Sequence, residues 1–471
     1  MLLLAAILLP AVGGALLPAL RLRTPRRRAV YVEAVTLLSS ALVCAVLLWV
    51  PRGLVYWLIP DLWGGTPLAL ALDDRGALFA GLVALLWPLA SLYGFAYLEG
   101  DAHWERFFAW YTVTYGVTLL VAFSANLLTL FVGYEFLTLS TLPLVAHKGD
   151  PASRRAGLAY AAWTFGGSAL GLIALGFVIQ FSPAGAAFTE GGILAAGTDP
   201  QLVGWLFLAA FLGFGVKAAV LPTSPWLPMV SVAPTPVTAL LHAVAVVNTG
   251  AFAVQRLVFD VFGPDTVRGT LPHSIALGLA CATVLAGSML AVREQHLKRR
   301  LAWSTVSNLS YMLMGALLLT PAGLQGSQSH FLYHSFMKMT LFLCAGAILT
   351  GSGREYVQQL RGLARKMPFT CAVFTLAGCA LVGIPPLCGF VSKWQLLTAA
   401  GAVGGWQGTL AIGTLIASAV LTAIYLMVPA VLCFFRPLTE DSDEPHDPDW
   451  RMKVPLILLS VLVVFSGISF Q

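Results

Sequence analysis

The sequence predicts an all-α integral membrane protein with about 14 transmembrane helices. Its 471 residues are 58% hydrophobic and only 10% charged, with a mean hydropathy of +0.83. Soluble proteins carry about 25% charged residues. Apolar runs recur along the whole chain, and they lack the alternation over about 10 residues that is typical of barrel strands. Composition and pattern therefore both favour a bundle of membrane-spanning helices.

The expected helices follow from where the apolar runs begin and end, because a crossing needs roughly 20 apolar residues. The runs fall at residues 3–20, 30–50, 78–98, 107–124, 126–146, 156–181, 201–231, 235–258, 272–292, 301–320, 328–350, 369–397, 405–435 and 453–470. The seventh and twelfth contain prolines, which remove backbone hydrogen bonds and favour broken helices. Two broken helices about five runs apart suggest two five-helix repeats, which we expect to be inverted.

Basic residues gather in alternate loops. The loop after the first run holds Arg21, Arg23, Arg26, Arg27 and Arg28. This excess places that loop in the cytoplasm. Later loops alternate in the same way between poor and rich in Lys and Arg, and this alternation puts both termini on the outer face of the plasma (inner) membrane. The net charge of +6 is thus explained without a nucleic-acid partner. Asp73, Asp74 and Arg75 are expected to cap the outer edge of the third run, and the acidic segment 440–450 to form a solvated cytoplasmic loop.

Ionisable side chains interrupt several of the apolar runs. These residues are Glu135, Lys217, His242, His330, His334, Lys338 and Lys393. Such residues are costly in hydrocarbon and usually face a bundle interior or a water-filled cavity. Any single one could instead form a structural ion pair that locks two helices together. The whole set favours a functional path through the membrane.

Three of these residues, His330, His334 and Lys338, follow one another at intervals of four. They therefore share one helix face about 12 Å long. Histidine titrates near neutral pH, and lysine can release its proton where arginine cannot. A metal site is the alternative for this spacing, but no third acidic or thiol ligand lies nearby. The spacing therefore predicts a face that carries protons.

The cysteines give no sign of redox chemistry. The seven cysteines are scattered singly in apolar runs without a CxxC pair, which predicts buried, inert thiols. No iron–sulfur, haem, flavin or nucleotide motif is visible. We therefore expect no cofactor and no metal on this chain, and any electron chemistry must lie on another chain.

Four segments resemble signatures of the antiporter-like subunits of respiratory complex I. The same family includes Mrp-type cation/proton antiporter subunits and relatives in membrane-bound hydrogenases. The segments are WLPMVSVAPTPVTALLHAVAVVNTGAF, LKRRLAWSTVSNLSYM, HFLYHSFMKMTLFLCAG and GIPPLCGFVSKW, which occur in order between residues 100 and 400. The resemblance implies that Glu135 pairs with Lys217, that Lys338 is the central lysine of the eleventh helix, and that Lys393 is the terminal ionisable residue of the broken twelfth.

The chain departs from the family pattern at particular positions. Asn248 stands where many relatives carry an eighth-helix lysine, so His242 is the expected titrating group there. Whether His242 or Asn248 lies on the path is left open by the sequence. Ser224 and Met229 replace a histidine and an aspartate around the WLP motif. Lys393 within GIPPLCGFVSKW favours the D-type or hydrogenase branch.

The resemblance implies a proton-translocating, non-redox subunit of a complex I-like (NADH:quinone oxidoreductase-like) or hydrogenase-like respiratory complex. The alternative is a subunit of an Mrp-type Na⁺/H⁺ antiporter without redox chemistry. A stand-alone solute carrier is disfavoured, because no polar pattern suggests a substrate-sized pocket. Expected partners are the bilayer, protons, Na⁺ under the antiporter alternative, and other membrane subunits, including homologous antiporter-like chains.

The resemblance also implies a division of the chain. We expect three N-terminal helices in 1–100, a first proton-channel repeat in 101–258, a second in 259–435, and a cytoplasmic loop with the last helix in 436–471.

Overall fold

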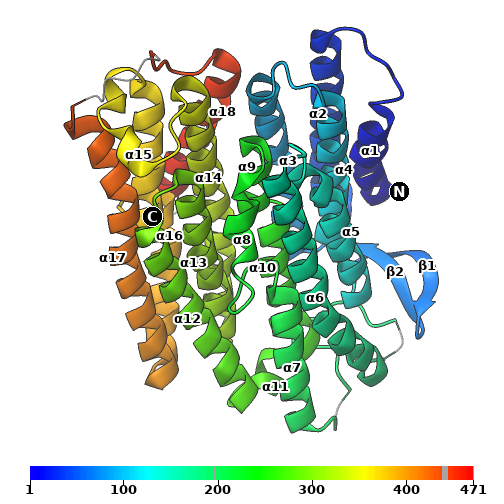
Figure 1. The fold of residues 1–471 in the computed structure, drawn as a ribbon. Helices are drawn as coiled ribbons and strands as arrows, with labels where there is room; N and C mark the ends of the chain where they lie inside the picture. Colours follow the sequence, from blue (N-terminus) through cyan, green and yellow to red (C-terminus); the bar gives the residue numbers. More distant parts are fainter. Residues whose placement is uncertain (184, 196, 438–443, 470–471) are drawn as a thin grey trace. The chain divides into compact units, whose positions relative to one another are not determined.

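The computed structural model is predominantly helical (Figure 1) and describes residues 1–183, 185–195, 197–437 and 444–469. Within these residues, nine helical segments are long and apolar enough to cross a membrane. They are α2 (Pro25–Trp49), α3 (Asp74–Tyr97), α5 (Leu127–Val145), α6 (Pro151–Phe181), the run from α9 to the π-helical turn (Thr235–Phe262), α12 (Leu271–Arg293), α14 (Pro321–Ser352), α17 (Gly405–Phe435) and α18 (Trp450–Ile468). The prediction of a helical membrane protein is confirmed at this level.

The other helices are shorter or more polar, except for α10, which is part of the run Thr235–Phe262. They are α1 (Leu2–Leu16), α4 (Trp104–Ala122), α7 (Pro200–Gly215), α8 (Trp226–Met229), α10 (Val246–Arg256), α11 (Pro264–Val267), α13 (Leu297–Leu317), α15 (Pro368–Val382) and α16 (Cys388–Val403). Every expected apolar run coincides with at least one helix in the described part of the chain.

Both expected helix breaks are present. The first separates α7, which ends at Gly215, from α8, which begins at Trp226. The second separates α15 from α16, across the segment GIPPL. A further break at residues 244–245, which the sequence did not suggest, divides α9 (Thr235–Ala243) from α10. The regular backbone hydrogen bonding of three helices is thus interrupted.

The segment 51–73 corrects the expectation of an entirely helical chain. It forms an antiparallel hairpin of β1 (Val55–Trp63) and β2 (Thr66–Ala71). Gly64 and Gly65 both have positive φ angles, of 60° and 77°, as a tight two-residue hairpin turn requires. The β1 sequence is rich in aromatic and branched side chains, which favour strands.

The chain forms two compact units, and the first comprises residues 1–91, 100–223 and 244–276. In this unit α1 packs against α2 and α4, while α5 packs against α4 and α6, and α6 against α7 (Figure 1). Helix α5 carries Glu135, and α7 leads directly into the segment that contains Lys217. Both helices belong to this unit.

The second unit comprises residues 92–99, 224–243 and those from 277 onward. Its centre is α14, which packs against α9, α13, α15, α16 and α18 (Figure 1). Thr320 caps the start of α14 by accepting a hydrogen bond from Gly323 N at 3.0 Å, and Gly353 ends it in the left-handed conformation. The helix that carries the His330–Lys338 stripe is thus enclosed on several sides.

Part of the acidic segment 440–450 lies outside the described residues. In the described part, Asp447 accepts hydrogen bonds from the backbone N–H groups of Phe369 and Thr370 at 3.1 and 3.0 Å. It also accepts one from the Thr370 hydroxyl at 2.7 Å. Asp447 therefore caps the start of α15 and is not simply solvated.

Candidate functional site

Lys217 lies just beyond the end of α7, in the first helix break, and its side chain is fully buried. Its ammonium group donates a hydrogen bond to the carbonyl oxygen of Tyr134 and lies 3.6 Å from the centre of the Tyr134 ring. The Tyr134 hydroxyl accepts from Lys217 N at 3.2 Å and donates to Phe214 O at 2.9 Å. One residue of α5 therefore holds both the backbone and the side chain of Lys217.

Glu135 follows Tyr134 on α5 and is close enough to Lys217 for an electrostatic interaction. No ion pair joins the two in the described residues, and Glu135 Oε1 is buried without a hydrogen-bond partner there. The structure thus brings the expected pair together in an open arrangement, in which the Tyr134 carbonyl takes the lysine.

The first break is held against α10 by a close backbone approach at Gly250. A Cβ atom at this position would lie 2.3 Å from Ala218 N and 2.7 Å from the carbonyl carbon of Lys217. These distances are shorter than any normal van der Waals contact, so only glycine allows the approach.

Lys338 is fully buried on α14 and points toward α13. Its ammonium group donates to Leu301 O at 2.9 Å and to the hydroxyl of Ser304. Both partners are neutral oxygen atoms. The described contacts therefore give Lys338 hydrogen bonds but no counter-ion.

Several buried histidine nitrogens lack hydrogen-bond partners among the described residues. They lie on α14, in the stripe that ends at Lys338, and on α9, at His242. His330 Nδ1 lies 2.9 Å from Ser392 Oγ, and the His330 and His334 rings are 6.0 Å apart. Within the described residues, His330 Nε2 and both ring nitrogens of His334 and His242 have no hydrogen-bond partner. The His242 ring stacks on Phe342 at 4.6 Å. Buried polar atoms of this kind are normally satisfied by ordered water, so this region suits a hydrated path.

Lys393 joins the two halves of the second broken helix. From α16 its ammonium group donates to Leu381 O at 2.7 Å and to Val382 O at 3.1 Å, both in the last turn of α15. The free carbonyls at a helix C-terminus carry partial negative charge, which a lysine complements. The Tyr311 ring lies 5.4 Å from the same ammonium group.

The structure distributes the seven predicted residues over both units. Glu135 and Lys217 lie in the first unit, and the other five lie on α9, α14 and α16 of the second. His242 is near the end of α9, whereas Asn248 is in the first turn of α10, beyond the break at 244–245. Which of these two belongs to the path stays a prediction.

A buried charge network that the sequence analysis missed lies in the first unit. Arg256, which is 1% exposed, bonds Asp73 Oδ1 at 2.6 Å and Asp260 Oδ2 at 2.9 Å. Arg75 also contacts Asp260. Asp73 is therefore more than the surface cap that was expected. An arginine inside the eighth run, four residues before an aspartate, was the signal that could have revealed this network.

Three buried serines form a second feature that the sequence did not indicate. Ser288 Oγ on α12 lies 2.8 Å from Ser307 Oγ on α13 and 2.6 Å from Ser418 Oγ on α17. Hydroxyl groups so arranged join three helices of the second unit through hydrogen bonds.

The seven cysteines, all within the described residues, are free thiols, and five of them are buried. Cys44 is exposed and Cys379 is half-buried, so the prediction of buried thiols is wrong for these two. The described residues contain no group of three or more His, Cys, Asp or Glu side chains that could hold a metal ion.

Comparison with known proteins places these features in context. Residues 124–421 match the family model described as "NADH:quinone oxidoreductase/Mrp antiporter, TM". NADH-quinone oxidoreductase subunit L of Mycobacterium tuberculosis is 30% identical over 438 residues, which cover 91% of this chain and 66% of that protein. Hydrogenase-4 component B of Escherichia coli is 30% identical over 435 residues, with 85% and 62% of the two chains covered. The chain therefore spans slightly less than two thirds of the length of these relatives.

A solved structure supports the fold. A chain of the Mrp complex from a Dietzia species superposes with a TM-score of 0.87 over 100% of this chain and 50% of that one, at 23% sequence identity. The antiporter-like fold thus extends over the whole chain.

Proposed function

The chain belongs to the NADH:quinone oxidoreductase/Mrp antiporter transmembrane family, and from this premise we propose that it translocates protons as a membrane subunit of a multi-subunit respiratory complex. The complex would be of the complex I or membrane-bound hydrogenase type. This chain would supply no redox cofactor of its own and would act only in ion movement.

The observation that carries the proposal is the environment of Lys338. This lysine is fully buried, and its described hydrogen bonds go to a carbonyl and a hydroxyl oxygen. A neutral amine and an ammonium group can both occupy such a site, because a hydroxyl both donates and accepts. Lys338 can therefore act as a reversible proton carrier.

The proposed path uses all seven residues. Protons enter from the cytoplasm, occupy Lys217, Lys338 or the histidines His242, His330 and His334, and leave near Lys393 toward the outside. Glu135 changes the proton affinity of Lys217 when the distance between them changes, because a charge in a low-dielectric site acts strongly. The open arrangement around Tyr134 supports this role, since rotation of Lys217 would make or break the ion pair.

The layout that accompanies this path has about 14 crossings, two inverted five-helix repeats and both termini on the outer face of the plasma membrane. The repeats would occupy 101–258 and 259–435. The helix break that contains Lys217 and the break before α16, which carries Lys393, support a related construction of the two repeats.

The partners would be other membrane subunits, including homologous antiporter-like chains. The relatives named subunit L and component B are, by those names, parts of larger proteins or assemblies. An Mrp-type Na⁺/H⁺ antiporter subunit is the second candidate, and the superposition on a chain of an Mrp complex favours keeping it.

The two candidates are separated by purifying the tagged full-length chain with its partners from native membranes. Recovery of iron–sulfur or hydrogenase-like subunits, with acidification of inverted vesicles on addition of an electron donor, is the expected result. Recovery of small membrane subunits alone, with proton movement driven only by a Na⁺ gradient, would favour the antiporter instead. Purified complex that moves no protons under either condition would contradict the proposal.

A further inference from the structure

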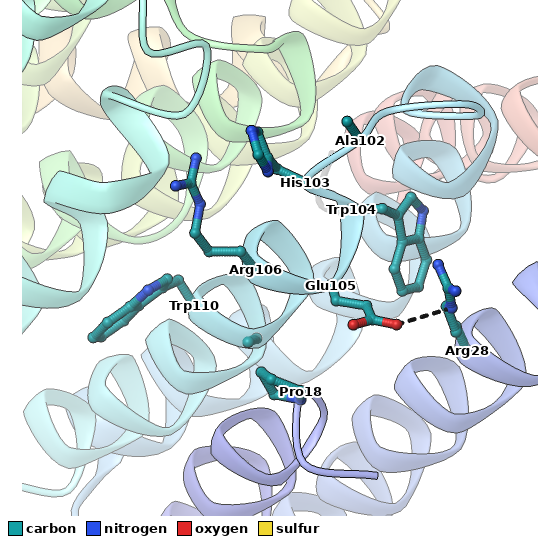
Figure 2. Close-up of a pocket in the computed structure, with 9 residues that line it drawn as sticks. Pro18, Arg28, Ala102, His103, Trp104, Glu105, Arg106 and Trp110 are labelled. Carbon is teal, nitrogen blue, oxygen red and sulfur yellow. Dashed lines mark ion pairs between the residues drawn. The ribbon is translucent and has the colours of Figure 1, made fainter. Parts of the chain in front are cut away.

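A cavity of about 480 Å³ lies in the first unit, beside the start of α4 and the segment that links α1 to α2 (Figure 2). It is lined by Pro18, Arg28, Ala102, His103, Trp104, Glu105, Arg106, Ala109 and Trp110. None of the residues on the proposed proton path contributes to it. The cavity therefore needs an explanation of its own.

The charges around this cavity leave a positive excess. Arg28 Nε lies 3.0 Å from Glu105 Oε1 and also donates to Leu22 O at 2.9 Å. Arg106 extends on the other side, toward His103 (Figure 2), and its guanidinium donates to His147 O at 3.2 Å. Among the described residues no carboxylate pairs with Arg106. Two arginines and one glutamate thus leave one uncompensated positive charge in the cavity.

The positive charge continues along α2. A second hollow, of about 510 Å³, is lined in part by Arg26, Arg27 and Tyr31. Neither arginine pairs with a carboxylate in the described part of the chain. The only acidic group that lines either hollow is Glu105, which is already bound to Arg28.

Aromatic and apolar side chains border the same cavity. Trp104 and Trp110 line it, and Trp110 is 38% exposed. Pro18 also lines it, and on either side of Pro18 the last residue of α1, Leu16, and Leu20 in the segment that follows are 48% and 44% exposed. Tryptophan and arginine side by side at the end of apolar helices are typical of the level at which lipid headgroups meet the acyl chains. The cavity thus combines a cationic wall with an apolar border.

We propose that this cavity binds the phosphodiester headgroup of an anionic phospholipid. Arg106 supplies a guanidinium that has no carboxylate partner among the described residues, and the N–H donors that do not bond His147 O match phosphate oxygens. Arg28 contributes charge from the opposite wall while it stays paired with Glu105. The acyl chains follow Trp110 and the exposed Leu16 and Leu20 on either side of Pro18. Basic pockets between membrane helices are known to hold such headgroups. This inference does not rest on the proposed function.

The test is native mass spectrometry of the full-length protein in a neutral detergent, titrated with phosphatidylglycerol or with phosphatidylcholine of the same acyl chains. An arginine near a membrane surface contributes about 1 kcal/mol of attraction to anionic lipid, which corresponds to about fivefold in affinity. We therefore expect the wild type to bind phosphatidylglycerol at least about fivefold more tightly than phosphatidylcholine. Arg106→Gln should remove this preference, and Arg106→Lys should keep most of it.

Arg361→Gln is the matched control, because Arg361 is exposed and, among the described residues, its side chain bonds only that of Gln358, at 3.3 Å. It should keep the full preference. Unchanged phosphatidylcholine binding by Arg106→Gln would show that the variant is folded. Equal binding of the two lipids by the wild type, or an undiminished preference in Arg106→Gln, would overturn the proposal. Displacement of phosphatidylglycerol by millimolar inorganic phosphate would also overturn the proposal, because the cavity would then be a site for free phosphate.

Discussion

His330 Nδ1 lies 2.9 Å from Ser392 Oγ, and this contact links the titratable face of α14 to α16, the helix that carries Lys393. Ser392 also donates to Gly389 O, at 3.4 Å. His330 and the Ser392 hydroxyl therefore form a hydrogen bond whose donor depends on the tautomer of the ring. The contact fixes the orientation of the His330 ring within the stripe.

Replacement of Ser392 by alanine should slow proton translocation. The buried hydrogen bond contributes about 1 kcal/mol, and without it the His330 ring loses its fixed orientation. We expect a reduced rate of acidification in vesicles that contain the assembled complex, with rescue by Ser392→Thr. Ser460→Ala is the control, because within the described part of the chain the Ser460 hydroxyl bonds only Leu456 O of its own helix, at 2.7 Å. Equal rates for both alanine variants would argue against a role for this contact.

Gly250→Ala should destabilise the first unit. The added methyl group would meet Ala218 N at 2.3 Å and force α10 away from the break that holds Lys217. Overpacking of this kind costs about 1–3 kcal/mol, seen as a lower melting temperature of the purified protein.

The matched substitution is Gly278→Ala on α12, where a Cβ atom would have no neighbour within 4 Å. Alanine is the better helix former, so this change should leave the melting temperature unchanged or raise it. A pair of variants with the same melting temperature would contradict the close approach at Gly250.

Asp73→Asn should lower stability at neutral pH, because Asp73 holds the buried Arg256 at 2.6 Å. Burial raises the pKa of Asp73, but the hydrogen bonds and charge of Arg256 outweigh it and hold the pKa below its ordinary value. The stabilisation is therefore fully present above the pKa of the unfolded chain, about 3.9, and is lost as the pH falls through the lower folded pKa. The difference in melting temperature between wild type and variant should be constant above about pH 5 and shrink below pH 4.

Asp74 provides the control for this pH dependence. Its side chain is 98% exposed and lies 3.4 Å from Arg52. Exposed ion pairs contribute little, so Asp74→Asn should behave as wild type throughout. If Asp73→Asn also matched the wild type at pH 7, the Arg256 network would have no stabilising role.

The sequence predicted the helices of the bundle well because their signals are local. Apolar runs mark the helices, and the prolines in VLPTSPWLP and GIPPLCG mark two of the breaks. The break at 244–245 carries no proline, so it had no such signal. The hairpin at 55–71 is too short and too aromatic to resemble a membrane helix, and its pairing depends on contacts between two strands.

The sequence indicated candidate residues for the site, but it did not indicate their contacts. Buried lysines and histidines are rare enough in apolar runs to be found by inspection. The direction of a lysine side chain cannot be found by inspecting the sequence, because this long, flexible side chain bonds whichever acceptor the tertiary structure offers. Lys217 binds Tyr134 O where Glu135 was expected, and Lys393 binds α15.

Lys338 tests the central claim most directly. Proton translocation should be measured in vesicles containing the assembled complex, for the wild type, Lys338→Ala, Lys338→Arg and the control Lys148→Ala, which changes an exposed loop lysine. Both Lys338 variants should assemble but fail to translocate protons, alanine because it carries none and arginine because it does not release one. Lys148→Ala should work as wild type. Full translocation by an assembled complex with Lys338→Ala would contradict the account.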